Sequence, residues 1–274
     1  MNDITPNTPD YTAIKSKQNA AWASGDYARI GITLQIVGET LAEAMDIDPR
    51  AKVLDVAAGN GNATLAFARR FCDVTSTDYV APLLAKGSAR AEADGLSVRF
   101  QVADAEALPF GDGSFDAVVS TFGVMFTPNQ KKAAGELMRV CRSGGQIGLA
   151  NWTPAGFIGQ LFKMLGGHVP PPAGVKSPAL WGDRAWIDET FGPSASAIDL
   201  TPLTFVFRYR SPAHFVDMFR SYYGPLHKAF QALDAAGQKA LEADLLTLMA
   251  RFNRATDGTL IVPGEYAQVI ITRR

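Results

Sequence analysis

The middle of the chain alternates short apolar runs with longer stretches of helical pattern. Five runs have the length of strands, namely 52–57, 73–78, 98–102, 115–120 and 146–151. Helical stretches separate most of these runs, with apolar residues recurring three or four positions apart. Strands that alternate with helices of about ten or more residues are typical of parallel βαβ units. The pattern therefore predicts an α/β fold with a parallel sheet.

The regions on either side of this sheet have other patterns. Residues 1–45 are a polar tail followed by helical stretches, which Ser24, Gly25 and Asp26 interrupt. Residues 153–200 hold three consecutive prolines and many glycines, which predicts an inserted cap rather than more sheet. We therefore expect an N-terminal helical segment over 1–45 and a cap over 153–200.

The last part of the chain returns to strands and helices. Residues 203–209 alternate apolar and polar side chains as a half-buried strand does, and 266–272 predict a closing strand. A helical pattern covers most of 211–252 between them. The predicted main domain thus combines 46–152 with 201–274.

Composition narrows the class of protein. The 274 residues include 26 Lys and Arg against 27 Asp and Glu, a net charge of −1, with 47% hydrophobic residues. Such a chain is globular, and it lacks the basic excess typical of nucleic-acid binding. With no apolar N-terminal leader and no apolar run of about 20 residues, we expect a cytoplasmic protein without membrane insertion. Cys72 and Cys141 have no Cys or His at ligand spacing, so we expect no metal.

One segment carries the candidate chemistry. A strand that contains Asp55 leads through Ala57 into a turn of Gly59, Asn60 and Gly61, and a helix follows. Glycines allow the chain to bend sharply and a ligand to approach the backbone. The free N–H groups at the start of the helix point to the same place. This arrangement suits any nucleotide-like ligand.

Three details narrow the class of ligand. Asp55 lies just before the turn, where a pyrophosphate would meet its negative charge. The third glycine of the dinucleotide pattern is absent, since Thr64 stands in that region. Asp78 ends the second strand, 78 − 55 = 23 residues further on, where an acid can accept both ribose hydroxyls.

Further candidates follow the third and fourth strands. In the run from Asp104 through Ala105 to Glu106, an acid can accept an adenine amino group and the Ala105 amide can donate to a ring nitrogen. The fourth strand ends at Thr121 and Phe122, beside the first strand. Ligands of open α/β sheets bind at such carboxyl ends.

Together these motifs resemble the class I S-adenosylmethionine-dependent methyltransferases. The match is closest to the small-molecule branch with the ubiquinone and menaquinone C-methyltransferases, called type 11. The resemblance rests on Asp55 to Gly61, on Asp78, on Gly144-Gly145 and on the run from Asp104 to Phe110. It implies a Rossmann-like sheet of seven mostly parallel strands with helices on both faces and an antiparallel last strand. It also implies S-adenosylmethionine as cofactor and S-adenosylhomocysteine as product.

The same resemblance suggests roles for several side chains. Tyr79 would pack on the adenine. Phe122 and Met125 would line the methyl-donor pocket, although ordinary packing explains them equally well. The N-terminal helices would form a lid, with Trp22 or Tyr27 touching the cofactor or serving only to anchor the helices.

The predicted function is methyl transfer to a small-molecule acceptor by in-line displacement. If the acceptor must lose a proton, His227 with Tyr223 is the pair we would test first as catalytic residues. Two alternatives stay open, a nicotinamide-dependent oxidoreductase and a non-catalytic S-adenosylmethionine-binding module. The acceptor atom and the oligomeric state do not follow from the sequence. The apolar side chains of the cap, such as Phe157 and Trp181, favour a partly apolar metabolite.

Overall fold

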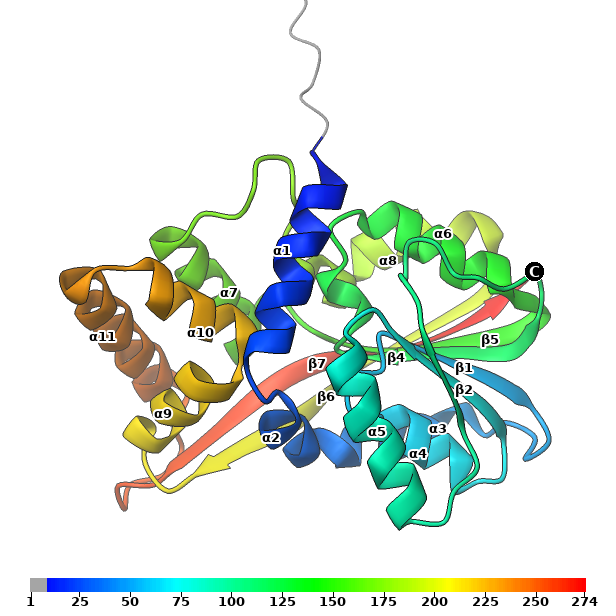
Figure 1. Ribbon diagram of the computed structural model, residues 1–274, viewed down its shortest axis with the longest axis horizontal. Coiled ribbons are helices and arrows are strands. Elements are labelled where there is room, and N and C mark those ends of the chain that lie inside the picture. The colour runs from blue at the N-terminus through cyan, green and yellow to red at the C-terminus, as the bar shows by residue number, and fades with distance from the viewer. Residues whose placement is uncertain (1–8) are drawn as a thin grey trace, which may run out of the picture.

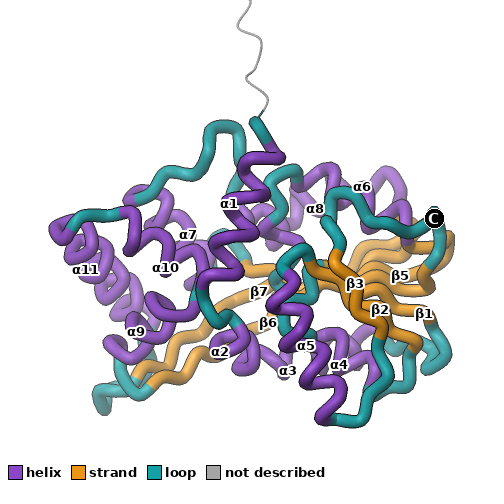
Figure 2. The backbone as a smooth tube through the Cα atoms, in the orientation of Figure 1, coloured by secondary structure: helices purple, strands orange, loops and turns teal. Residues whose placement is uncertain are grey.

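The computed structural model describes residues 9–274 and is built on one seven-stranded sheet (Figures 1 and 2). The strand order is β3-β2-β1-β4-β5-β7-β6. The strands are β1 (Lys52–Val56), β2 (Asp73–Asp78), β3 (Arg99–Val102), β4 (Phe115–Thr121), β5 (Cys141–Trp152), β6 (Ala195–Tyr209) and β7 (Leu260–Arg273). Only β7 runs antiparallel to its neighbours, β5 and β6. The predicted fold is confirmed.

Helices cover both faces of this sheet. The α-helices are α1 (Tyr11–Ser24), α2 (Ala28–Gly31), α3 (Gln35–Met45), α4 (Asn62–Ala68), α5 (Ala81–Ala93), α6 (Gln130–Val140), α7 (Phe157–His168), α8 (Arg184–Phe191), α9 (Pro212–Tyr222), α10 (Gly224–Ala232) and α11 (Ala235–Phe252). Short 3₁₀ turns are η1 (Ile32–Leu34), η2 (Val124–Phe126), η3 (Pro178–Gly182) and η4 (Gly192–Ser194). Figure 1 shows α3, α4 and α5 on one face of the sheet and α6 and α8 on the other. In the described part of the chain, no helix has the length and apolarity that crossing a bilayer requires.

Side chains alternate between the two faces along the central strands. Val53 of β1 packs in the apolar cluster under α3 and α4, whereas Leu54 belongs to the cluster on the opposite face. Both are fully buried, as expected for a central parallel strand covered on each side. The carboxyl ends of β1, β2 and β4 therefore meet at one edge with little room to move.

A second group of helices lies beside the sheet. The long antiparallel pair of β6 and β7 extends past the end of β5 (Figure 1). Helices α9, α10 and α11 connect these two strands along the chain. Helix α7 packs on α11 and on β7, so it belongs to this group. Helix α1 contacts α10 and lies between the group and the sheet.

Two boundaries differ from those that the sequence predicts. Residues 195–200 are the start of β6, and within the expected cap α7 joins the side group while α8 packs on α6. The segment 153–200 is therefore not one packed unit. In addition, the fifth strand begins earlier than the predicted 146–151, because α6 stops at Val140 and β5 already begins at Cys141, so that Gly144 and Gly145 lie within the strand. The two glycines lie where β5 is irregularly paired with β4, and a Cβ on Gly145 would meet the Asp116 carbonyl at 2.6 Å.

Candidate functional site

A cavity opens at the carboxyl ends of β1, β2 and β4, under α1. It encloses about 890 Å³, including its open mouth, which is a typical size for a small-molecule site. Nine of the predicted cofactor-binding residues line it, namely Ala57, Gly59, Asn60, Asp78, Tyr79, Asp104, Ala105, Thr121 and Phe122. The strand ends thus bring together residues from four separate motifs.

The turn after β1 is built from left-handed backbone. Gly59 has φ 58° and Gly61 has φ 83°, which glycine adopts without strain. Ala57 has φ 52° and Phe122, at the end of β4, has φ 57°. Both of these non-glycine residues line the cavity. Strained backbone of this kind is common in functional sites.

Asp55 lies behind this turn and not in the cavity. Its Oδ2 accepts hydrogen bonds from the Thr64 backbone N–H at 2.8 Å and the Thr64 hydroxyl at 2.6 Å. Burial raises the pKa of Asp55 to about 7 despite these bonds. Asp55 therefore does not line the cavity, and its side chain holds the first turn of α4. Gly61 also lies outside the lining, where a Cβ would be 3.5 Å from the Gly87 Cα of α5.

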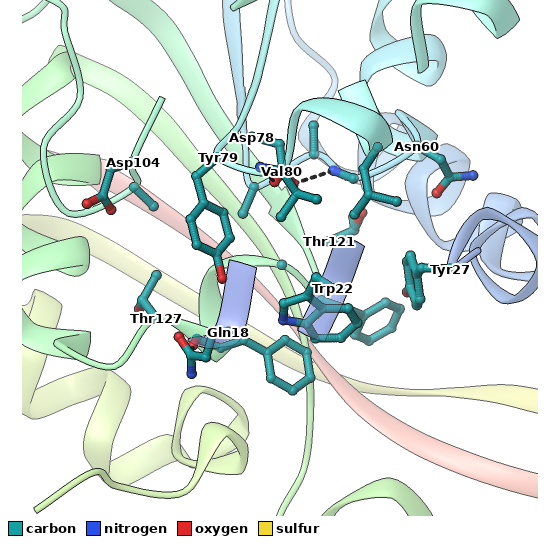
Figure 3. Close-up of a pocket in the computed structure, with 18 of the residues that line it drawn as sticks. Gln18, Trp22, Tyr27, Asn60, Asp78, Tyr79, Val80, Asp104, Thr121 and Thr127 are labelled. Carbon is teal, nitrogen blue, oxygen red and sulfur yellow. Dashed lines mark hydrogen bonds between the residues drawn. The ribbon is translucent and has the colours of Figure 1, made fainter. Parts of the chain in front are cut away.

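Asp78 is the buried acid of the cavity. Its Oδ2 accepts the Gly59 N–H at 2.8 Å and its Oδ1 accepts the Val80 N–H at 2.8 Å (Figure 3). The side chain is 5% exposed, and burial raises its pKa to about 6, although the amide bonds act in the opposite direction. A carboxylate has four lone-pair positions, so two of them stay available for a ligand.

A second acid, Asp104, faces the cavity from beyond β3. The Lys15 Nζ of α1 lies 2.5 Å from Asp104 Oδ2 and 3.1 Å from Glu106 Oε2. Burial lowers the pKa of Lys15, but the two carboxylates outweigh it and raise the pKa overall. Glu106 does not line the cavity, because it is 1% exposed and accepts the Asn129 N–H at 2.8 Å. We call Gly59, Asp78, Tyr79 and Asp104 the acidic end of the cavity.

Four rings also line the cavity, and we call Trp22, Tyr27, Phe122 and Phe126 the aromatic end. The two ends meet at Tyr27, whose ring is 3.9 Å from the position of a Cβ on Gly59. The Trp22 ring packs edge-on against Tyr27 and Phe126, with centroids 5.4 and 5.0 Å apart. The Phe122 ring stacks on the Trp152 ring, with centroids 4.0 Å apart. Figure 3 shows Trp22 and Tyr27 on the side away from Asp104. Met125, predicted to line the pocket, is instead fully buried beside it.

Helix α1 is attached to the strand ends by polar contacts that the sequence analysis missed. Besides the Lys15 pairs, Asn19 Nδ2 donates to the Tyr79 carbonyl at 2.7 Å, and Gln18 Nε2 donates to the Phe126 carbonyl at 3.2 Å. The partners lie 60 and 108 residues apart in the chain. No local motif marks such contacts, so only the folded chain reveals them.

The predicted catalytic pair does not reach the cavity. Tyr223 is buried behind Trp22, with ring centroids 5.5 Å apart, and burial raises its pKa well above the usual range. His227 lies in a separate surface pocket with Gln231 and Phe230. Its Nδ1 is 2.9 Å from the Arg220 carbonyl, in the last turn of α9, where helix carbonyls need partners. His227 therefore does not line the cavity under α1.

This strand order and this cavity define the class I methyltransferase fold. A methyltransferase domain family matches residues 54–149. An uncharacterized protein of Mycobacterium tuberculosis is 40% identical over 280 residues, which cover 100% of this chain and 99% of that protein. The demethylmenaquinone methyltransferase of Thermus thermophilus is 40% identical over 124 residues, 44% of this chain and 56% of that enzyme.

Solved structures agree on the fold. The YcgJ protein of Bacillus subtilis matches with a TM-score of 0.58 and 18% identity, over 87% of this chain and 99% of that one. The chain belongs to the class I S-adenosylmethionine-dependent methyltransferases, in the type 11 group. The predicted family is confirmed.

Proposed function

We propose that this chain transfers the methyl group of S-adenosylmethionine to a small, largely apolar acceptor held in the cavity under α1. The observation that carries the proposal is that one cavity joins the acidic end to the aromatic end. The acidic end suits a nucleoside, and the aromatic end suits an apolar acceptor. Donor and acceptor can therefore lie side by side.

The residues of the acidic end fit the cofactor. Asp78 has lone pairs for two ribose hydroxyls, and Asp104 can accept an adenine amino group. The Asn60 Nδ2 is a buried donor that lacks a partner among the described residues, and it suits the carboxylate of a methionine group. Buried donors without partners are rare in proteins, because each costs about 1–3 kcal/mol.

The mechanism places modest demands on the protein. Bound S-adenosylmethionine would supply a methyl group on a positively charged sulfur. The strand ends would fix the nucleoside, and the rings of the aromatic end would orient the acceptor. Orientation of this kind contributes roughly 7–11 kcal/mol to lowering a barrier. Helix α1 would exclude water, so within the predicted segment 1–45 we propose that this helix acts as the lid, since α3 packs with α4 on one face of the sheet.

Titration calorimetry of the full chain with S-adenosylmethionine, S-adenosylhomocysteine and NAD tests the first step. We expect both sulfur ligands to bind and NAD to show no heat. NAD binding without S-adenosylmethionine binding would overturn the proposal and favour an oxidoreductase. Release of S-adenosylhomocysteine with a panel of metabolites tests the second step. Cofactor binding without turnover of any of them would indicate a non-catalytic binding module.

A further inference from the structure

The cavity offers no free positive charge to an acceptor. Within residues 9–274, Lys15 is the only Lys, Arg or His that lines it, and both of its close partners are carboxylates. Residues 1–8 contain no Lys, Arg or His in their sequence. A carboxylate or phosphate brought to the aromatic end would lose its water without gaining a counter-ion, which is costly. The acceptor therefore carries no anionic group.

The aromatic end is suited to a positive charge. The rings of Trp22, Tyr27 and Phe126 come from α1, from the segment before α2 and from η2, and they lie around one part of the cavity. Aromatic faces attract cations, most strongly when both are removed from water. A positive charge that meets a face of one of these rings during the reaction is therefore stabilised.

One polar atom at this end still needs a partner. Gln18 Nε2 donates to the Phe126 carbonyl at 3.2 Å, which fixes the orientation of the amide. Its Oε1 is buried and lacks a hydrogen-bond partner among the described residues. Figure 3 shows Gln18 near Trp22, on the side of the cavity away from Asp78. An N–H group on the acceptor would satisfy this oxygen.

Among residues 9–274, no Asp, Glu or His lines the aromatic end of the cavity. Asp78 and Asp104 lie at the acidic end, where backbone amides and Lys15 already use them. Burial raises the pKa of Tyr27 and of Tyr79, so both phenols stay protonated near neutral pH. Hydroxyl and carbon acceptors usually need a base, whereas a neutral amine carries its own lone pair.

We propose that the aromatic end binds an apolar primary or secondary amine without a carboxylate or phosphate, and that its nitrogen accepts the methyl group. The inference rests on the proposed function. The amine is an ammonium ion in neutral water, so it first gives one proton to the solvent and enters the cavity in its neutral form. Its nitrogen lone pair then forms the new N–C bond while the C–S bond breaks and its electron pair stays on sulfur. The positive charge passes from sulfur to nitrogen, beside the rings. The extra proton leaves to water after release.

Binding to the protein loaded with S-adenosylhomocysteine tests the recognition step. The probes share one skeleton: trimethyl(3-phenylpropyl)ammonium, 3-phenylpropan-1-ol and 3-phenylpropanoate. We expect calorimetry to show the ammonium binding about tenfold tighter than the alcohol, with the carboxylate weakest. Equal or tighter binding of the alcohol or the carboxylate, or no binding of the ammonium, would overturn the proposal.

Two variants separate ring electrostatics from apolar contact. Trp22→Leu should lower the affinity for the ammonium probe about tenfold and the affinity for the alcohol much less. Trp22→Phe should keep most of the affinity for the ammonium probe. Thermal unfolding checks that each variant is folded. Because Trp22 packs on other rings, Phe126→Leu provides a second, smaller test of the same kind. Equal losses for both probes in these variants would mean that the rings supply only apolar surface.

Turnover completes the test. With S-adenosylmethionine, N-methyl-3-phenylpropylamine should give the dimethyl product by mass spectrometry, and the alcohol should give none. Methylation of the alcohol in preference to the amine would contradict the inference but leave the proposed function intact. Absence of S-adenosylhomocysteine binding in the same samples would instead remove the proposed function itself.

Discussion

The two ends of the cavity are built in different ways. The acidic end comes from the ends of β1, β2 and β3, within residues 55–106, and its geometry is set by backbone hydrogen bonds such as Gly59 N–H to Asp78. The aromatic end is assembled from α1, the segment before α2, the end of β4 and η2, and the contacts between its rings are side-chain packing. A ligand common to a large family can be bound by backbone geometry. An acceptor that differs between members is better selected by exchangeable side chains.

The largest effect that separates the two ends is expected from Gly59→Val. Position 59 has φ 58° and lines the cavity, so a branched side chain would be strained and would occupy the space of the ligand. We expect S-adenosylhomocysteine affinity to fall at least about 100-fold by calorimetry, as steric exclusion adds to backbone strain.

Gly95→Val is the matched control for this variant. Gly95 has φ 66° and follows α5 away from the cavity, and a Cβ at this position would meet no neighbouring atom within 4 Å. Both variants should lose roughly 1–2 kcal/mol of stability from the left-handed backbone. Only Gly59→Val should lose cofactor binding. Normal affinity in that variant would place the cofactor somewhere other than the β1 turn.

Asp78→Asn should have the next largest effect. The amide keeps the shape of the side chain but donates where the carboxylate accepts, so it loses a charge-assisted bond to the ribose. We expect affinity to fall by about 1–3 kcal/mol, or roughly 5- to 150-fold. Asp116→Asn is the control, since Asp116 also accepts a backbone N–H, from Lys52 at 2.8 Å, but lies away from the cavity. Similar losses in both variants would remove Asp78 from the site.

The raised pKa of Asp78 gives the same contact a pH dependence. The ligand hydroxyls bind the ionised acid, whose pKa in the free protein is about 6. Protonation competes with binding below that value, so affinity should fall up to about tenfold per pH unit as pH decreases from 6 to 5. The stability of the free protein changes with pH in the opposite direction. The folded state binds the Asp78 proton more tightly than the unfolded state does, so the free energy of unfolding rises as the pH falls. Asp78→Asn should flatten the affinity curve between pH 5 and 7; an unchanged slope would assign the titration to another group.

The sequence predicted the acidic end well for a physical reason. A strand that ends in a glycine turn, followed by an acid at the end of the next strand, places its residues through local geometry and sheet register alone. Asp78, Tyr79 and Asp104 accordingly line the cavity as expected. Asp55 and Glu106 belong to the same motifs but bond inward, to Thr64 and to the Asn129 amide. Motif membership therefore predicts proximity, whereas the direction of a side chain depends on its partners.

The aromatic end could be predicted only in part. Trp22 and Tyr27 were candidates, but the contact of Trp22 with Phe126 depends on how α1 crosses the strand ends. His227 lies outside the cavity, where its ring contacts the Arg220 carbonyl at the end of α9. Tertiary contacts between distant segments decide these positions, and a single sequence does not encode them as a pattern.

Lys15→Met should give the smallest effect and tests whether the two ends act independently. Lys15 lies on the same helix as Trp22 but pairs with Asp104 at the acidic end, so it links both. A partly exposed ion pair contributes about 0.2–1 kcal/mol. Its loss also frees Asp104 for the adenine. The two consequences oppose each other, so we expect S-adenosylhomocysteine affinity to change less than about fivefold and the cofactor to dissociate faster in stopped-flow experiments. Lys131→Met, which breaks an exposed pair with Glu189, is the control and should change neither quantity. A loss as large as that of Asp78→Asn would mean that Lys15 belongs to the cofactor site itself, and that α1 is a fixed wall rather than a lid.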